Sequence, residues 1–306
     1  MKDSTDMVTP MPSVRTLLEG AIDYAGLFPP SQYTMERAVN NYALNRSGVF
    51  GWMMGRFVLP VARLDEFLEA ANQYLTGPSR SPWKLSVLAS EDAYDSIKSI
   101  MRFNRENAGK VVIDSFEVKA NTTSKIENTV DALPEFITSY FEIPPAAANF
   151  PDLVATLAIN KQCAKIRTGG VKADAFPKSK EVIRFVRTCM AANVPFKATA
   201  GLHHPIRCFK PLTYDDNAPS GTMHGFLNVF LMTGFARESY KPDVLEEVLE
   251  DEFAEAFTFD PESITWRSEN KLELWQIDRL RRFGIQSFGS CSFEEPIEDL
   301  SELGLL

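Results

Sequence analysis

The chain has 306 residues, of which 44% are hydrophobic, and it carries a formal net charge of −9. This length allows one large domain or two medium ones, each with a sizeable core. The negative charge argues against nucleic acid or an anionic membrane as the main partner, and no apolar run reaches the ~18–20 residues that a membrane span needs.

The N-terminal segment, MKDSTDMVTPMPSV, lacks the apolar stretch of a secretory signal, and we expect it to form a loose tail. The sequence contains four cysteines and no CxxC pair. This pattern indicates reduced thiols in a cytoplasmic protein rather than a disulfide framework.

Short apolar segments alternate with segments of helical spacing along most of the chain. The predicted strands are residues 21–27, 52–59, 85–88, 111–118, 136–143, 163–168, 195–199 and 285–293. Such alternation is typical of a parallel α/β sheet. Eight strand–helix units in this length predict a TIM (β/α)8 barrel. An open doubly wound sheet is the alternative, but the sequence has no GxGxxG after the first strand.

Residues 205–283 interrupt the alternation between the seventh and eighth predicted strands. A loop that contains Pro211, Pro219 and Gly221 comes first. Helices are then predicted at residues 225–233, 244–257 and 270–283. We therefore expect a single barrel domain over residues 1–306, with residues 205–283 as a helical insertion or lid.

Polar residues lie near the carboxyl ends of the predicted strands, where TIM barrels place their active sites. These residues are Asp23, Arg56, Glu117, Glu142, Lys165, Arg167, Lys197, His203, His204 and Ser290. The strands were assigned from apolar runs and breakers and not from these residues. Their grouping therefore indicates a functional site.

Two lysines dominate this set, because each lies in an apolar run and is followed four residues later by glycine. They are Lys165 and Lys197, on strands joined by one helix, so both amines could reach one cavity. An amine attacks a carbonyl only when it is neutral, and we expect Lys197 and Arg167 to lower the pKa of Lys165. The alternative is a buried ion pair of Lys165 with Glu142 or Glu117. The spacing does not decide which lysine would be the nucleophile.

Three carboxylates, Glu117, Glu142 and Asp23, are candidates for proton transfer or for neutralising the lysines. The adjacent His203 and His204 are candidates for acid–base chemistry or anion binding. Neighbouring residues on a strand point in opposite directions, so we expect only one of the two imidazoles to face the site.

The last predicted strand ends in small residues, Gly289, Ser290 and Ser292 with Cys291 between the serines. Such an end leaves backbone N–H groups free, and barrels often bind phosphate at the ends of strands seven and eight. The alternative is a plain strand-to-helix turn. Arg56 and Arg167 are further candidates for holding a substrate.

The segments KIRTGG and KATAG resemble the class I, Schiff-base aldolases of the deoxyribose-phosphate aldolase type. In that family the first motif carries the Schiff-base lysine, which corresponds to Lys165, and the second carries another lysine, which corresponds to Lys197. Glu142, Asp23 and the segment FGSCS also resemble family positions. The likeness is best over residues 163–201.

The sequence departs from this family in places that bear on the site. Arg167 stands where the family has a small polar residue, which would narrow the pocket. The catalytic Asp on the family's fourth strand has no clean counterpart, so Asp114 or Glu117 must take its place. The segment from 205 to 283 is much longer than in the family.

Three functions fit these observations. The resemblance implies a lyase that acts on a small oxo substrate, anionic or phosphorylated, through a lysine imine and without a cofactor. The second is a metal-dependent barrel isomerase or lyase with Glu142 and His203 or His204 as ligands. The third is a non-catalytic barrel that binds an anionic metabolite. A small molecule is the expected partner in each case, and the sequence permits a homo-oligomer.

Overall fold

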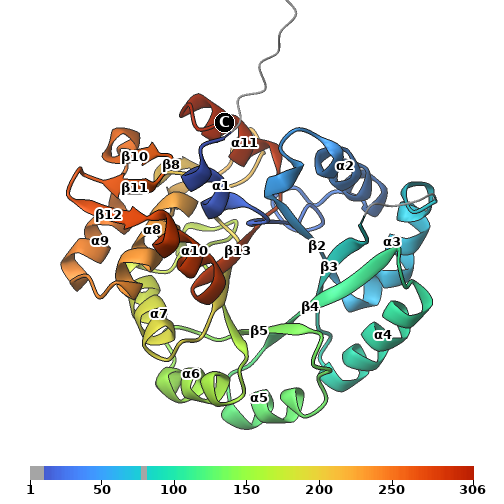
Figure 1. The fold of residues 1–306 in the computed structure, drawn as a ribbon. Helices are drawn as coiled ribbons and strands as arrows, with labels where there is room; N and C mark the ends of the chain where they lie inside the picture. The colour runs from blue at the N-terminus through green and yellow to red at the C-terminus, as the bar shows by residue number, and fades with distance from the viewer. Residues whose placement is uncertain (1–9, 77–80) are drawn as a thin grey trace, which may run out of the picture.

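The computed structural model describes residues 10–76 and 81–306, so most of the predicted N-terminal tail lies outside the described residues. Within them, eight parallel strands close into a barrel in the order β1-β13-β7-β6-β5-β4-β3-β2 (Figure 1). The strands are β1 (Ile22–Tyr24), β2 (Met54–Pro60), β3 (Trp83–Leu88), β4 (Val111–Lys119), β5 (Thr138–Glu142), β6 (Cys163–Arg167), β7 (Phe196–Thr199) and β13 (Ile285–Ser290). All eight predicted strands and the TIM-barrel fold are confirmed.

Helices surround the barrel and cover its outer face (Figure 1). They are α1 (Pro12–Leu18), α2 (Met35–Ser47), α3 (Leu64–Ala71), α4 (Ala93–Glu106), α5 (Thr123–Val130), α6 (Phe150–Ile159), α7 (Ser179–Ala191), α8 (Phe226–Arg237), α9 (Pro242–Glu250), α10 (Leu274–Phe283) and α11 (Glu294–Glu302). Several start at side chains suited to an N-cap. Asp92 accepts hydrogen bonds from the backbone at the start of α4, and Thr122 does so at the start of α5. No helix in the described part of the chain is long and apolar enough to cross a membrane.

The apolar core lies between the barrel and the helices. The rings of Phe185 and Phe196 meet edge to face with centroids 5.3 Å apart, and Phe226 stacks on Phe288 at 4.8 Å. The interior of the barrel itself is polar, because Asp23, Glu117, Lys165 and Lys197 are all buried there. Buried charges are costly unless they are paired, and here lysines and carboxylates lie together.

The three helices predicted in residues 205–283 are present as α8, α9 and α10, but the prediction missed the short strands of this segment. The segment contains an antiparallel hairpin, β8 (Cys208–Pro211) with β9 (Ser220–Met223), and a three-stranded sheet. The strands of that sheet are β10 (Phe257–Asp260), β11 (Ser263–Trp266) and β12 (Asn270–Glu273). These strands have four residues each, too few to show a period of two clearly. The Asp260 side chain accepts hydrogen bonds from the Glu262 backbone and the Ser263 hydroxyl, which closes the first turn.

This insertion lies beside the barrel, with β10–β12 next to α8 and α9 on the outside (Figure 1). Asn228 on α8 fixes the neighbouring loops, because its amide nitrogen donates to the carbonyls of Val248 and Asp251 at 2.8 Å. None of the described residues of the insertion lines the cavity that holds Lys165. Its hairpin reaches the rim of the barrel, where Tyr214 contacts Glu295 and Lys210 contacts His204.

The ends of the two lysine strands are held against each other. The Thr168 hydroxyl donates to the carbonyl of Ala200 at 2.7 Å. Gly169 and Gly201 touch through their backbones, since a Cβ added to either would lie 2.8 Å from the Cα of the other. Gly201 also has a φ of +75°, a conformation that glycine adopts readily. The loops that follow β6 and β7 are therefore locked together beside the site.

Candidate active site

The barrel brings one row of charged residues to the same level on four neighbouring strands. Lys119 of β4 is the register partner of Glu142 on β5, and Glu142 is the partner of Lys165 on β6. Lys165 is in turn the partner of Lys197 on β7. Register partners in a sheet point to the same face. Sequence positions far apart thus meet at the carboxyl ends of the strands.

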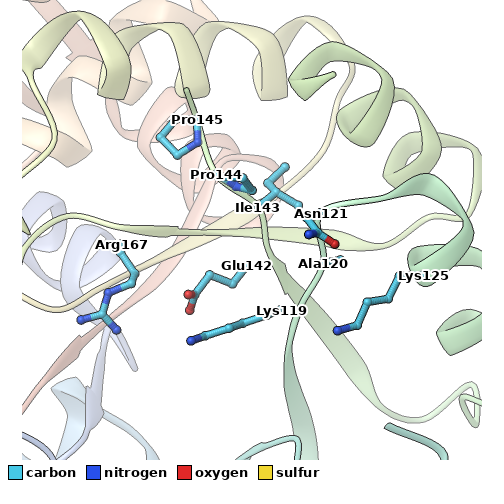
Figure 2. A pocket seen from close by; sticks show the side chains of 9 residues that line it. All are labelled: Lys119, Ala120, Asn121, Lys125, Glu142, Ile143, Pro144, Pro145 and Arg167. Atoms are coloured by element: carbon cyan, nitrogen blue, oxygen red, sulfur yellow. The ribbon is translucent and has the colours of Figure 1, made fainter. Parts of the chain in front are cut away.

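Two cavities adjoin this row. The first has a volume of about 260 Å³, and its lining includes Lys165, Glu117, Glu142, Thr199, His203, Gly289 and Cys291. The second, of about 440 Å³, lies at the ends of β4, β5 and β6 and is shown in Figure 2. Lys119, Glu142 and Arg167 line both cavities. The first cavity is large enough for a small molecule and contains the predicted reactive lysine.

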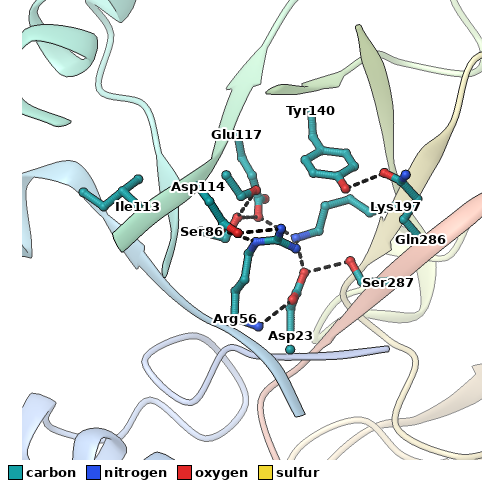
Figure 3. Close-up of polar contacts among 12 residues, drawn as sticks. Asp23, Arg56, Ser86, Ile113, Asp114, Glu117, Tyr140, Lys197, Gln286 and Ser287 are labelled. Carbon is teal, nitrogen blue, oxygen red and sulfur yellow. Dashed lines mark hydrogen bonds and ion pairs between the residues drawn. The ribbon is translucent and has the colours of Figure 1, made fainter. Parts of the chain in front are cut away.

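Glu117 lies at the centre of the charge network. One of its oxygens, Oε2, is 2.8 Å from Lys165 Nζ, and the other, Oε1, is 2.7 Å from Lys197 Nζ. Lys165 also contacts Glu142 at 2.9 Å, and Lys197 contacts Asp23 at 2.5 Å. Figure 3 shows the Lys197 side chain directed between the carboxylates of Glu117 and Asp23. A single carboxylate therefore bridges the two predicted lysines.

Neutral donors fix these carboxylates in place. The Ser86 hydroxyl donates to Glu117 at 2.6 Å. Asp23 accepts from the Ser287 hydroxyl and from the backbone N–H of Arg56, both at 2.8 Å (Figure 3). Gly55 leaves room for Asp23, because a Cβ there would lie 2.5 Å from its Oδ1. Charged groups held by this many partners form a rigid centre.

The expectation that a second cation lowers the pKa of Lys165 is wrong. Burial lowers that pKa, but the adjacent carboxylates of Glu117 and Glu142 outweigh it, and the net shift is upward. For Glu117, burial raises the pKa, while Lys165 and Lys197 lower it more strongly, to well below its ordinary range. The alternative considered from the sequence, a buried ion pair of Lys165 with Glu142 or Glu117, is the arrangement found.

The two lysines differ in access. Lys165 lines the first cavity, with 5% of its surface exposed, whereas Lys197 is 1% exposed and does not line it. Lys197 instead lies behind Glu117 and over the ring of Tyr140, 5.3 Å from the centroid. Of these two amines, Lys165 is thus the one that a molecule in the cavity can reach.

Several predicted substrate-binding residues lie away from this cavity. Arg56 binds Asp114 at 2.6 Å and does not line the cavity. It lies near the start of β2, whereas Val58, closer to the end of that strand, does line the cavity. His204 contacts Asp299 at 2.6 Å and lines only a smaller neighbouring pocket. Arg167, His203 and Gly289 do line the cavity.

The turn after β13 is occupied by contacts within the chain. Ser290 is buried, and its backbone carbonyl accepts from the N–H of Ala25 at 2.7 Å. The Ser292 hydroxyl accepts from the backbone N–H of Glu295 at 3.2 Å and so caps the first turn of α11. Neither serine lines the cavity, and the first turn of α11 carries Glu294 and Glu295.

The residues considered for a metal site do not meet. His203 Nδ1 contacts Glu295 at 3.1 Å, and His204 contacts Asp299, while Glu142 is bound to Lys165. In the described ranges no three or more residues of the types His, Cys, Asp and Glu are grouped so that they could hold a metal ion.

A polar cluster at the rim of the cavity was missed by sequence reasoning. It consists of His203, Cys291, Glu295 and Tyr214, in which the Tyr214 hydroxyl donates to Glu295 at 2.9 Å and His203 Nδ1 lies 3.8 Å from Cys291 Sγ. Burial lowers the pKa of His203, but Cys291 and Glu295 raise it more, to about 10. These residues are far apart in the sequence: His203 was predicted as a site residue and Cys291 lies in FGSCS, but neither Tyr214 nor Glu295 gave a signal.

This cluster predicts a reactive thiol at Cys291. Burial raises its pKa, but the His203 cation lowers it more, whereas burial raises the pKa of Cys208 to about 11. We expect iodoacetamide at pH 7.5 to alkylate Cys291 before Cys208, as peptide mass spectrometry would show, because the thiolate is the nucleophile.

The matched variant is His203→Gln, which removes the cation beside the thiol. Labelling of Cys291 should then slow by about ten-fold, the effect of one pKa unit, while labelling of Cys208 stays unchanged. Equal rates for Cys291 in both proteins would contradict this account.

The fold and the site define a TIM barrel with two lysines bridged by one carboxylate at its centre. Models of known protein families give no match to this chain, and no curated protein matches it either. The function is therefore argued from the geometry.

Proposed function

We propose that the protein is a lyase of the aldolase type, which acts on a small oxo substrate through an imine of Lys165. The observation that carries this proposal is the position of the Lys165 amine. It faces a cavity, is almost fully buried, and lies within 2.9 Å of two carboxylates. A buried amine with an adjacent proton acceptor is the arrangement that covalent catalysis by lysine requires.

Glu142 is the proposed proton carrier, because it contacts Lys165 and lines both cavities. It accepts a proton from the Lys165 ammonium, and the neutral amine then adds to the substrate carbonyl carbon. The same proton returns to the hydroxyl of the carbinolamine, which leaves as water and gives the iminium ion. Glu142 then removes the proton of a β-hydroxyl group, and the bond between the α and β carbons breaks. The electron pair of that bond converts the iminium to a neutral enamine, and the β carbon leaves as the first carbonyl product.

Glu142 returns that proton to the enamine carbon, and addition of water to the resulting iminium releases the second carbonyl product and restores the Lys165 ammonium. Glu117 has a different role, because its lowered pKa keeps it ionised. Its carboxylate stabilises the positive charge of the iminium on Lys165. Lys197 and Asp23 are positioning residues, since Lys197 holds Glu117, Asp23 holds Lys197, and neither lines the cavity.

Trapping of the imine tests this function directly. The protein is incubated with propanal, acetone or pyruvate and then reduced with sodium borohydride, and the peptides are analysed by mass spectrometry. We expect a secondary-amine adduct on Lys165 and none on Lys197. If no carbonyl compound labels Lys165 above the level of exposed lysines, the barrel is a binding protein rather than a Schiff-base enzyme.

The pH dependence of trapping follows from the pKa of Lys165, which is raised above its ordinary value of 10.5. The neutral amine becomes more abundant as the pH rises towards that raised value, so labelling should increase through the alkaline range. Glu142→Gln removes one of the two carboxylates that raise the pKa. We expect the midpoint of labelling to fall by about one pH unit or more.

The control for that experiment is Glu135→Gln, which makes the same change in charge at an exposed position. Its labelling midpoint should match that of the unmodified protein. An unchanged midpoint in Glu142→Gln would show that this carboxylate does not govern the Lys165 amine.

A further inference from the structure

The second cavity contains an unusual group of positive charges. It is lined by Lys119, Ala120, Asn121, Lys125, Glu142, Ile143, Pro144, Pro145 and Arg167, and Figure 2 shows the charged side chains around it. Three of them are cations, and the one carboxylate, Glu142, is already bound to Lys165. The chain as a whole carries a net charge of −9, so this excess of positive charge is local.

These three cations have no carboxylate partner in residues 10–76 and 81–306. The salt bridges of that part of the chain include none from Lys119, Lys125 or Arg167. Arg167 makes one long contact, from Nη2 to the carbonyl of Gly169 at 3.5 Å. By contrast, the cations at the barrel centre each bind one or two carboxylates. Guanidinium and ammonium groups that converge without a counter-charge are suited to bind an anion.

The second cavity is joined to the first by the side chains that line both. Lys119 and Lys165 lie at the same level on β4 and β6, with Glu142 on the strand between them. Two strand spacings correspond to about 10 Å between backbones, and the long side chains of Lys119 and Arg167 shorten the gap. A small molecule can therefore place one end at Lys165 and the other among the cations.

The alternative position for an anion, the turn after β13, is less suitable. The Ser292 hydroxyl already caps α11, and Glu295 beside it is a carboxylate. Negative charge at that end of the cavity repels an anionic group. The positive charges thus lie at the ends of β4, β5 and β6, and carboxylates lie at the turn after β13.

We propose that Lys119, Lys125 and Arg167 bind the anionic end of the substrate, a phosphate or a carboxylate, while its carbonyl carbon meets Lys165. This inference rests on the proposed function and names the class of substrate, a short oxo compound with a terminal anion. Asn121 lines the same cavity and offers an amide donor to that anion.

Binding of inorganic phosphate is the first test, because it does not depend on imine formation. Titration calorimetry would compare the unmodified protein and the double variant Lys119→Gln with Lys125→Gln. We expect phosphate to bind the double variant at least about ten-fold more weakly. The control pair, Lys84→Gln with Lys110→Gln, makes the same charge change at exposed positions near the amino ends of β3 and β4, and should bind as the unmodified protein does.

Borohydride trapping then distinguishes the type of anion. Glyceraldehyde 3-phosphate carries a phosphate, succinic semialdehyde carries a carboxylate, and propanal carries neither. The double variant should lose labelling by one or both anionic aldehydes at low concentration and keep labelling by propanal. Phosphate binding without any trapping would support the anion site and refute the lyase. Trapping by propanal with equal phosphate affinity in the double variant would refute the anion site and leave the lyase standing.

Discussion

If Lys165 is the proposed nucleophile, replacing it by methionine is expected to abolish borohydride labelling and to lower turnover at least about a thousand-fold, as loss of the nucleophile does in covalent enzymes. A thioether cannot form an imine, yet methionine has a similar length and fills most of the same space. Glu117 keeps its bond to Lys197, and Glu142 is partly exposed to water at the cavity. The variant should therefore fold, which circular dichroism and a thermal melt would check.

The matched control is Lys172→Met, an exposed lysine in the loop that follows β6. It should keep full labelling and full turnover. The assignment of Lys165 fails if Lys165→Met still forms a reducible adduct with the same carbonyl compound, or if Lys172→Met loses its adduct as well.

Replacing Glu117 by glutamine is expected to cost about 3–5 kcal/mol in the free energy of unfolding at pH 7, the usual range when a buried ion pair loses one partner. Glu117 is the only group in the described residues that contacts both lysine amines. In the variant, Lys197 keeps its contact with Asp23 and Lys165 keeps its contact with Glu142. Each buried ammonium group then has one carboxylate partner in place of two. Urea unfolding would measure the loss.

The same variant has a defined pH dependence. The pKa of Glu117 lies well below its ordinary value of 4.5, so its stabilising contribution is complete above that value. The contribution is lost as the pH falls from about 4.5 towards the folded-state pKa. The stability difference between the unmodified protein and Glu117→Gln should shrink over this range.

Glu127→Gln, at an exposed position on α5, is the control and should unfold like the unmodified protein. A difference between Glu117→Gln and the unmodified protein that stays constant down to pH 3 would argue against the ionised, doubly paired Glu117. A difference below about 1 kcal/mol at pH 7 would have the same meaning.

The sequence predicts the barrel well, because a parallel strand buried on both faces needs a continuous apolar run. Each of the eight strands contains a short, mainly apolar segment that polar residues interrupt, and proline or glycine ends most of these segments. The antiparallel sheet at β10–β12 gave no comparable signal. Its strands are short and lie among acidic residues, and their pairing depends on the turn that Asp260 closes.

Part of the site was also predictable. Lys165, Glu117 and Glu142 share one cavity because the strand register aligns them, and the sequence indicated that all three lie near the carboxyl ends of their strands. The pKa of Lys165 was not predictable, since its direction depends on which charges make contact and not on which lie nearby. Lys197 is the register partner of Lys165, but the Glu117 carboxylate contacts both amines. As a result the pKa of Lys165 is raised and not lowered.

The misplacement of Arg56 and His204 has a similar cause. Each lies in the correct stretch of sequence, but one or two residues decide whether a side chain points into the cavity or away from it. The cations at Lys119 and Lys125 were missed for the opposite reason. They look like ordinary surface lysines, and only the folded chain shows that they and Arg167 surround one cavity.

The backbone contact between Gly169 and Gly201 limits how this barrel can change by mutation. A methyl group at either position would meet the other glycine and the ring of Phe176, so neither can be exchanged alone without pushing the two loops apart. The close approach of Gly169 and Gly201 thus explains why a glycine follows each lysine at the same spacing. A descendant of this barrel in which both lysines had been replaced would still be expected to retain both glycines.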